Sequence, residues 1–239
     1  MKALLSLGSL ALIVTALAST QTSASSSTAI TKEHTIHVIN EPVNNKHHIE
    51  LVTYILNAMK QWAPASTIIR SHNTDRFPSI ADDIVTVVLD PTEPSLFHDD
   101  PSKLKTAVLL ATVAYFEGHF WEYVEDGTCN ASDRSNPILK NGPCDGGTAY
   151  SLWQIHPEHG LVLLNNTWGY STHNDSINVI TGEKLLADRK LSAKTALHFL
   201  RASLNRNGTL CEYTGEHKEC PKAKARLDFA NAWVKAHAS

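Results

Sequence analysis

The chain has 239 residues, of which 42% are hydrophobic and 19% are charged, and it carries a formal net charge of −3 at pH 7. Its length suits one medium domain with a substantial core, or a small domain with a tail. A nearly balanced charge without a long basic run argues against nucleic acid as the partner.

The first residues have the pattern of a secretory signal peptide. Lys2 precedes an apolar stretch from Ala3 to Leu17, and Ala16-Leu17-Ala18 has the small-x-small form of a signal-peptidase site. The stretch is too short to favour a membrane-spanning anchor. We therefore expect a signal peptide over residues 1–18, a secreted or periplasmic location, and no stable membrane span after cleavage.

A Ser- and Thr-rich segment follows the signal peptide. Residues 19–45 show no sustained periodicity, which is typical of a flexible lead-in. The folded domain is predicted over residues 46–239. Its first helix is indicated by apolar residues that recur at helical spacing between Ile49 and Trp62.

Two further helices are predicted in the first half of the chain. The first spans Pro78 to Leu89, with Pro78 in its opening turn. The second begins with Asp100 as N-cap and Pro101 at the first helical position, and it continues to Tyr115. It is apolar nearly all round, as expected for a helix at the centre of the core.

The second half of the chain is predicted to be loop-rich and then helical. Residues 121–150 hold many Asn, Asp, Gly and Pro and predict a long loop, a kind of segment that is usually functional. Helical spacing returns over Thr181–Ala187, from a Ser192 cap to about Leu204, and from near Pro221 onward. Because strand-like alternation is scarce, the fold class is predicted to be mostly α.

The four cysteines predict two local disulfides. In an exported protein an even number of cysteines favours pairing, here Cys129 with Cys144 and Cys211 with Cys220. A zinc site built from all four thiolates is the alternative, but the sequence has no Cys-x-x-Cys pair. We therefore expect two disulfides, each stapling a loop.

Two motifs in the middle of the chain carry a family resemblance. Glu117 ends the apolar helix and is followed by Gly118 and Phe120, and the run Gly146-Gly147-x-Ala-Tyr-Ser-Leu-Trp-Gln154 comes later. These segments resemble the Glu-Ser-x-Phe and Gly-x-x-Gln motifs of the soluble lytic transglycosylase and goose-type lysozyme superfamily. Residues 211–215, Cys-Glu-Tyr-Thr-Gly, match its third motif weakly. The resemblance covers roughly residues 100–215 and implies a lysozyme-like helical domain with an active-site cleft.

The resemblance implies that the protein cuts the β-1,4 bond between N-acetylmuramic acid and N-acetylglucosamine. Glu117 matches the catalytic acid, and burial at the end of an apolar helix favours the protonated form of its carboxyl group. Gln154 matches an amide that faces the cleft, and Tyr213 a tyrosine that hydrogen-bonds the acid or the substrate. The alternatives are a surface Glu, a buried Gln that satisfies backbone groups, and a Tyr used for packing.

A second carboxylate would decide the outcome of the reaction. Goose-type lysozymes carry an Asp nine residues before the motif Gln and another two residues after it. Asp145 occupies the first place, as a second catalytic candidate, and His156 stands in the other. Asp145 is equally suited to a turn, because Asp-Gly-Gly is a turn signal. The choice between lysozyme and lytic transglycosylase therefore stays open.

The remaining predictions concern ligands. We include His156 and Trp168 among the substrate-binding residues, Trp168 because a ring in a polar loop can stack on a sugar. The His156-Pro157-Glu158-His159 spacing superficially suggests a metal site, but the proline spoils a helical pair, so no metal and no organic cofactor are expected. The expected partner is peptidoglycan glycan strands, bound by a monomer. A catalytically silent glycan-binding module on the same fold is the alternative.

Overall fold

The computed structural model describes residues 41–63, 74–130, 144, 147–158, 160–171, 178–216 and 218–237. All of these belong to the unit Ile39–Ser239. The predicted signal peptide and the lead-in up to residue 40 lie outside the described residues.

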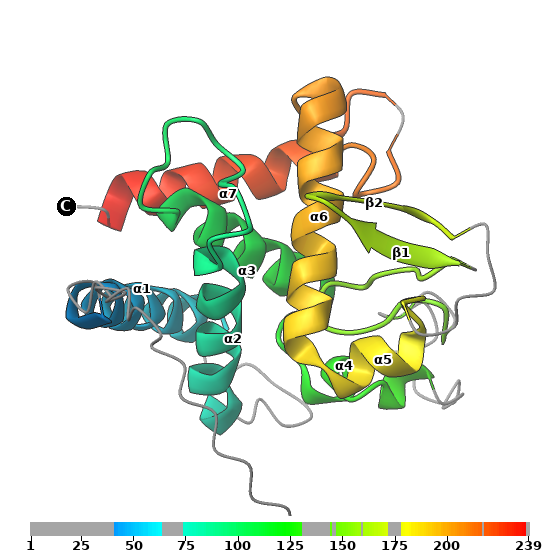
Figure 1. Ribbon diagram of the computed structural model, residues 1–239, viewed down its shortest axis with the longest axis horizontal. Helices are drawn as coiled ribbons and strands as arrows, with labels where there is room; N and C mark the ends of the chain where they lie inside the picture. The colour runs from blue at the N-terminus through cyan, green and yellow to red at the C-terminus, as the bar shows by residue number, and fades with distance from the viewer. Residues whose placement is uncertain are drawn as a thin grey trace, which may run out of the picture. The chain divides into compact units, whose positions relative to one another are not determined.

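The described residues are mostly helical, which confirms that part of the predicted fold class. The helices are α1 (Glu41–Trp62), α2 (Phe77–Leu89), α3 (Leu104–Gly118), α4 (Glu122–Glu125), α5 (Gly182–Ala187), α6 (Arg189–Asn207) and α7 (Pro221–His237), with short 3-10 turns at Thr74–Arg76 and Thr128–Asn130. Two strands, β1 (Leu161–Leu164) and β2 (Thr167–Tyr170), form an antiparallel hairpin. Helix α3 contacts α1, α2, α6 and α7, and the hairpin packs on α6 (Figure 1).

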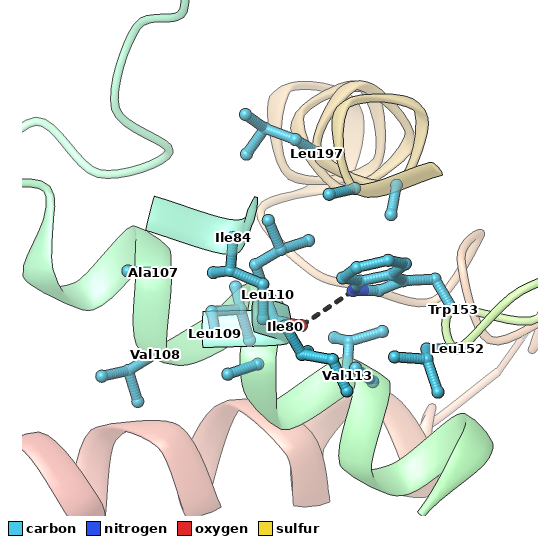
Figure 2. Packing of buried hydrophobic residues seen from close by; sticks show 14 of the residues in the cluster. Ile80, Ile84, Ala107, Val108, Leu109, Leu110, Val113, Leu152, Trp153 and Leu197 are labelled. Carbon is cyan, nitrogen blue, oxygen red and sulfur yellow. Dashed lines mark hydrogen bonds between the residues drawn. The ribbon is translucent and has the colours of Figure 1, made fainter. Parts of the chain in front are cut away.

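The core is built around α3, which is the apolar helix predicted from the sequence. Every residue from Thr106 to Ala114 is buried, so helices can pack on all of its sides. Trp153 lies against α3 with no exposed surface and donates its indole N–H to the Leu110 carbonyl at 3.0 Å (Figure 2). This bond fixes the Gln154 motif to the central helix and gives the buried ring nitrogen a partner.

The start of α3 differs from the prediction, although Asp100 still caps it. The N-cap position belongs to Lys103, whose φ is 59°, and Pro101 lies in the turn before the helix. Asp100 nonetheless accepts hydrogen bonds from the backbone N–H groups of Lys105 at 3.1 Å and Thr106 at 2.9 Å. The capping chemistry was therefore predicted correctly, but the carboxylate acts from one turn outside the helix.

Two other boundaries are corrected. Helix α1 begins at Glu41, so the last residues of the predicted 19–45 lead-in form its first turn. Helix α6 begins at Arg189 and not at Ser192, because Asp188 is the N-cap and accepts from the Leu191 N–H at 2.9 Å. Ser192 is buried inside the helix, where its hydroxyl donates to the Leu185 carbonyl at 2.6 Å.

The hairpin was not predicted as strands. Leu161 pairs with Tyr170 and Leu164 with Thr167, and Asn166 turns the chain with a φ of 61°. Strands of four residues are too short for their alternation to stand out from a polar loop. Arg201 on α6 donates to the Asn166 carbonyl at 3.0 Å, which ties the hairpin to the helix that it packs on.

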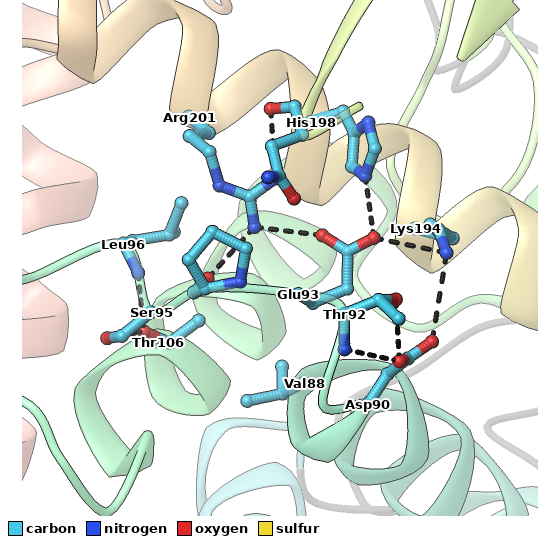
Figure 3. A network of polar contacts seen from close by, with 12 residues as sticks. Val88, Asp90, Thr92, Glu93, Ser95, Leu96, Thr106, Lys194, His198 and Arg201 are labelled. Carbon is cyan, nitrogen blue, oxygen red and sulfur yellow. Dashed lines mark hydrogen bonds and ion pairs between the residues drawn. The ribbon is translucent and has the colours of Figure 1, made fainter. Parts of the chain in front are cut away.

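A buried network of charges joins the segment after α2 to α6. Glu93 has 2% of its surface exposed, and it contacts His198 at 2.8 Å, Arg201 at 3.0 Å and Lys194 at 3.1 Å (Figure 3). The other ring nitrogen of His198 lies 2.8 Å from the Thr167 carbonyl. The ring of His198 therefore connects the Glu93 carboxylate with the backbone of the hairpin.

These partners determine the charge of Glu93. Burial by itself raises the pKa of Glu93, but hydrogen bonds from His198 and Lys194 and the positive charges of His198 and Arg201 outweigh it. Together they lower the pKa of Glu93 from 4.5 to about 2. The carboxylate therefore stays ionised inside the protein.

Both predicted disulfides are present. Cys129 is bonded to Cys144 and Cys211 to Cys220, across sequence separations of 15 and 9 residues. Among the helices of the described residues, none has the length and the apolar character needed to cross a membrane.

Removal of a disulfide should lower the free energy of unfolding. We expect the Cys211→Ser/Cys220→Ser double variant to lose about 2–4 kcal/mol, because a cross-link restricts the unfolded chain. Urea unfolding followed by circular dichroism measures this loss. The wild type should also lose stability in reductant, whereas a variant with all four cysteines replaced by serine should not respond to it. If reductant left the free energy of unfolding of the wild type unchanged, the prediction would be wrong.

The Glu93 network should make stability depend on pH. The pKa of this carboxyl is lowered by folding, so its contribution is complete above pH 4.5 and is lost as the pH falls toward 2. A shift of this size corresponds to roughly 3 kcal/mol. Urea midpoints measured between pH 2 and 6 should fall steeply for the wild type and less for Glu93→Gln. The exposed Glu50→Gln is the control and should follow the wild type.

Candidate functional site

A pocket of about 410 Å³ gathers the predicted substrate-binding residues. Gln154, His156, Trp168 and Tyr213 all line it. They come from three separate segments: the turn and loop that precede β1, strand β2, and the loop that follows α6. The prediction of these four residues from motifs and residue type thus selected side chains that share one surface.

One wall of the pocket is aromatic. Trp168 and Tyr170 are two residues apart on β2, so both side chains leave the strand on the same face. Trp168 stacks on Phe199 of α6 with ring centroids 4.7 Å apart and meets Tyr170 edge-on at 5.4 Å. Such a wall suits a flat ligand with an apolar face.

The remainder of the lining is polar. The Tyr170 hydroxyl donates to Glu158 at 2.5 Å, and this hydrogen bond, with burial and the charge of Glu158, raises the pKa of Tyr170. Arg206 and Glu212, which also line the pocket, form an ion pair. The pocket therefore offers donors and acceptors for hydroxyl or amide groups beside its aromatic wall.

Gln154 has a structural role in addition to its place in the lining. Its carboxamide nitrogen donates to the Ser151 carbonyl at 3.0 Å, and its oxygen accepts from the backbone N–H of Cys144. Tyr150 and Ile155 exchange two backbone hydrogen bonds of 2.9 Å across the same turn. The amide thus holds together the turn and one end of the Cys129–Cys144 disulfide. This is the alternative given above, in which Gln154 satisfies backbone groups.

Glu117 has a different electrostatic setting from the one that was predicted. It lies in the last turn of α3, with 20% of its side chain exposed, and its Oε1 accepts from Arg226 Nε at 3.0 Å and Nη2 at 2.6 Å. We expected burial to favour the protonated carboxyl. A guanidinium partner stabilises the ionised carboxylate instead.

Tyr213 connects this ion pair with the pocket. It lines the pocket, and the charge of Glu117 helps burial to raise its pKa well above the ordinary value while Arg226 opposes the shift. The resemblance implied that the Tyr213 hydroxyl bonds the acid or the substrate. In the structure this hydroxyl donates to the Trp153 carbonyl at 2.6 Å. Glu117 itself is not among the described residues that line the pocket.

The other predicted site residues have mixed outcomes. His156 is exposed in the lining, with Nδ1 at 3.4 Å from the Thr148 hydroxyl. Asp145, the second candidate carboxylate, lies outside the described residues. Within the part of the chain that the structure describes, no group of three or more His, Cys, Asp or Glu side chains is arranged to hold a metal ion.

Arg226 and Phe199 were missed by the sequence reasoning. An arginine in an amphipathic helix looks like a solvent-facing residue, yet Arg226 is buried together with Ala223 and Ala230 on one face of α7. Spacings of three and four residues between these positions form the stripe that a helix turns inward. That stripe was the available signal.

No family model, curated protein or solved structure matches this chain. The family resemblance therefore depends on the sequence motifs alone.

Gly118 explains one departure from the motif. A Cβ at this position would lie 2.8 Å from the Leu152 carbonyl oxygen and 3.3 Å from the Leu152 Cα, because the end of α3 packs directly on the turn before Gln154. A serine, usual in the family motif, would require the two segments to separate. The glycine thus sets the distance between the Glu117 helix and the Gln154 turn.

Replacement of this glycine should destabilise the protein. Alanine normally stabilises a helix relative to glycine, but the added methyl at 118 meets backbone, so we expect Gly118→Ala to cost about 1–3 kcal/mol. Gly169→Ala is the control, since its added methyl first meets the end of the Leu164 side chain. Urea unfolding measures both. A stabilised Gly118→Ala variant would show that the close approach to Leu152 relaxes without strain.

Proposed function

We propose that this protein is an exported, monomeric enzyme with a lysozyme-like fold that cleaves peptidoglycan glycan strands. The proposal depends mainly on one observation, which is that Gln154, His156, Trp168 and Tyr213 line one pocket. The two disulfides support a secreted or periplasmic location, where such bonds persist.

The pocket has the chemistry that a polysaccharide requires. Sugar rings present apolar faces and hydroxyl-bearing edges, and the Trp168–Phe199 stack can cover a face while Glu158 and Glu212 accept hydrogen bonds at the edge. Acetamido groups of the glycan add an amide donor and acceptor, which the polar part of the lining can also bind. The charge of Glu117 adds to burial in raising the pKa of Tyr213, a lining residue, although Glu117 does not itself line the pocket.

Glu117 would act first as an acid and then as a base. It gives a proton to the bridging oxygen as the bond from that oxygen to the muramyl C1 breaks, and positive charge develops on the sugar ring. The resulting carboxylate then accepts a proton from the hydroxyl that attacks C1. Attack by water gives a reducing muramyl end, and attack by the 6-hydroxyl of the same muramyl residue gives a 1,6-anhydro end.

A glycan-binding module without catalysis is the second candidate. Two contacts favour it: the Gln154 amide is engaged with Ser151 and Cys144, and Glu117 is paired with Arg226. Both contacts reduce the availability of groups that a catalyst uses, whereas the aromatic wall serves binding alone.

Digestion of purified peptidoglycan separates the two candidates. We expect the mature protein to release muropeptides and Glu117→Gln to release none, because the amide cannot donate the required proton. Mass spectrometry identifies the ends: anhydro-muramyl products indicate a transglycosylase, and reducible ends a lysozyme. Glu183→Gln, at an exposed position of α5, controls for the loss of one charge.

Two results would count against the catalytic proposal. If Glu117→Gln still turned over substrate, Glu117 would lose its role. If the wild type released nothing but sedimented with peptidoglycan, the binding module would be the better account.

A further inference from the structure

The contact between Glu117 and Arg226 has features that a surface ion pair lacks. Arg226 is 8% exposed at its side chain and lies on α7, while Glu117 lies on α3. Arg226 Nη1 donates to the Lys222 carbonyl at 2.9 Å, and the guanidinium carbon of Arg226 lies 5.3 Å from the centre of the Phe116 ring. Three different contacts therefore fix the guanidinium before any ligand arrives.

The geometry points to a role for this arginine in the reaction. We propose that Arg226 is a positioning residue that holds Glu117 ionised and oriented in the free protein, so that cleavage is confined to acidic solution. This inference rests on the function proposed above. It adds Arg226, a residue outside the motifs, as a regulator of the acid.

The orientation follows from the atoms involved. Both Nε and Nη2 of Arg226 donate to Oε1 of Glu117. A proton on Oε1 would oppose these donors, so the proton that is given to a substrate has to be carried on Oε2. Arg226 thereby selects which oxygen of the acid can serve.

Two other titratable groups lie near Glu117 on the elements described. Tyr213, from the loop after α6, is kept neutral by burial and by the charge of Glu117, and its hydroxyl donates to a backbone carbonyl. On α3 itself the next titratable residue is the exposed His119, at the C-cap. Lys222 of α7 faces the arginine through its carbonyl oxygen.

The sign of the pH effect follows from the role of the acid. A general acid must be protonated, and the arginine favours the ionised form, so the active fraction decreases as the pH rises through a low midpoint. Without the positive charge, the carboxyl would hold its proton to higher pH. An opposite charge at this range typically moves the midpoint of a carboxyl by about 1–3 pH units.

The test combines a titration with an activity profile. Carbon-13 NMR of labelled glutamate carboxyl groups follows the ionisation of Glu117 in the wild type, with Glu117→Gln to assign its signal. We expect a wild-type midpoint below the ordinary value of about 4.3. Arg226→Gln should raise the midpoint by about one unit or more, and Arg226→Lys should restore most of the shift. The upper limit of the pH–rate profile on peptidoglycan should move with it.

A matched control uses the same helix. Lys224→Gln removes an exposed positive charge of α7 that pairs with Asp228, so it should move neither the Glu117 midpoint nor the pH profile. If Arg226 only stabilised the fold, its replacement would lower the melting temperature without moving the pH profile of cleavage.

Each outcome decides a different question. A wild-type midpoint at or above the ordinary value overturns the inference, even if Arg226→Gln fails to fold, and so does an unmoved midpoint in a folded Arg226→Gln. If the midpoint moves as expected but no variant cleaves peptidoglycan, Arg226 keeps its effect on Glu117 and the proposed enzymatic function fails.

Discussion

The burial of α3 on all its sides is the constraint on which the rest of the structure depends. Because its residues contact helices in every direction, the segments that pack on it have little freedom. Trp153 is tied to the Leu110 carbonyl, and Gly118 lies against Leu152 without room for a side chain. The Gln154 turn and the end of the Glu117 helix are therefore held together as one unit, and Gln154 of this unit lines the pocket.

Two carboxylates, Glu93 and Glu117, are each paired with an arginine but differ in their surroundings. Glu93 is 2% exposed and is surrounded by His198, Lys194 and Arg201, so its charge is neutralised several times over. Glu117 is 20% exposed, ends a helix and influences a tyrosine of the pocket. A ligand can reach the second carboxylate far more easily than the first. Glu93 therefore has a structural role, whereas the more accessible Glu117 is the carboxyl that the proposed reaction would use.

The sequence predicted features that depend on local patterns and missed those that depend on tertiary contacts. The central apolar helix and the two disulfides follow from spacing and residue type. The start of α6 was misplaced because both Asp188 and Ser192 can cap, and only packing buries the second. Arg226 was missed because an arginine usually faces solvent, although its spacing from Ala223 and Ala230 placed it on the inward stripe of α7.

The stability of the fold does not by itself account for Arg226. A buried ion pair gains little net free energy, because removing two charges from water costs about as much as their attraction returns, and an apolar pair would join α3 to α7 equally well. The pair does change the proton affinity of the carboxyl, and it does so at the residue that the motif marks as the acid. The proposed role of Arg226 in setting the proton affinity of Glu117 would account for a charged pair here, whereas joining the two helices does not require one.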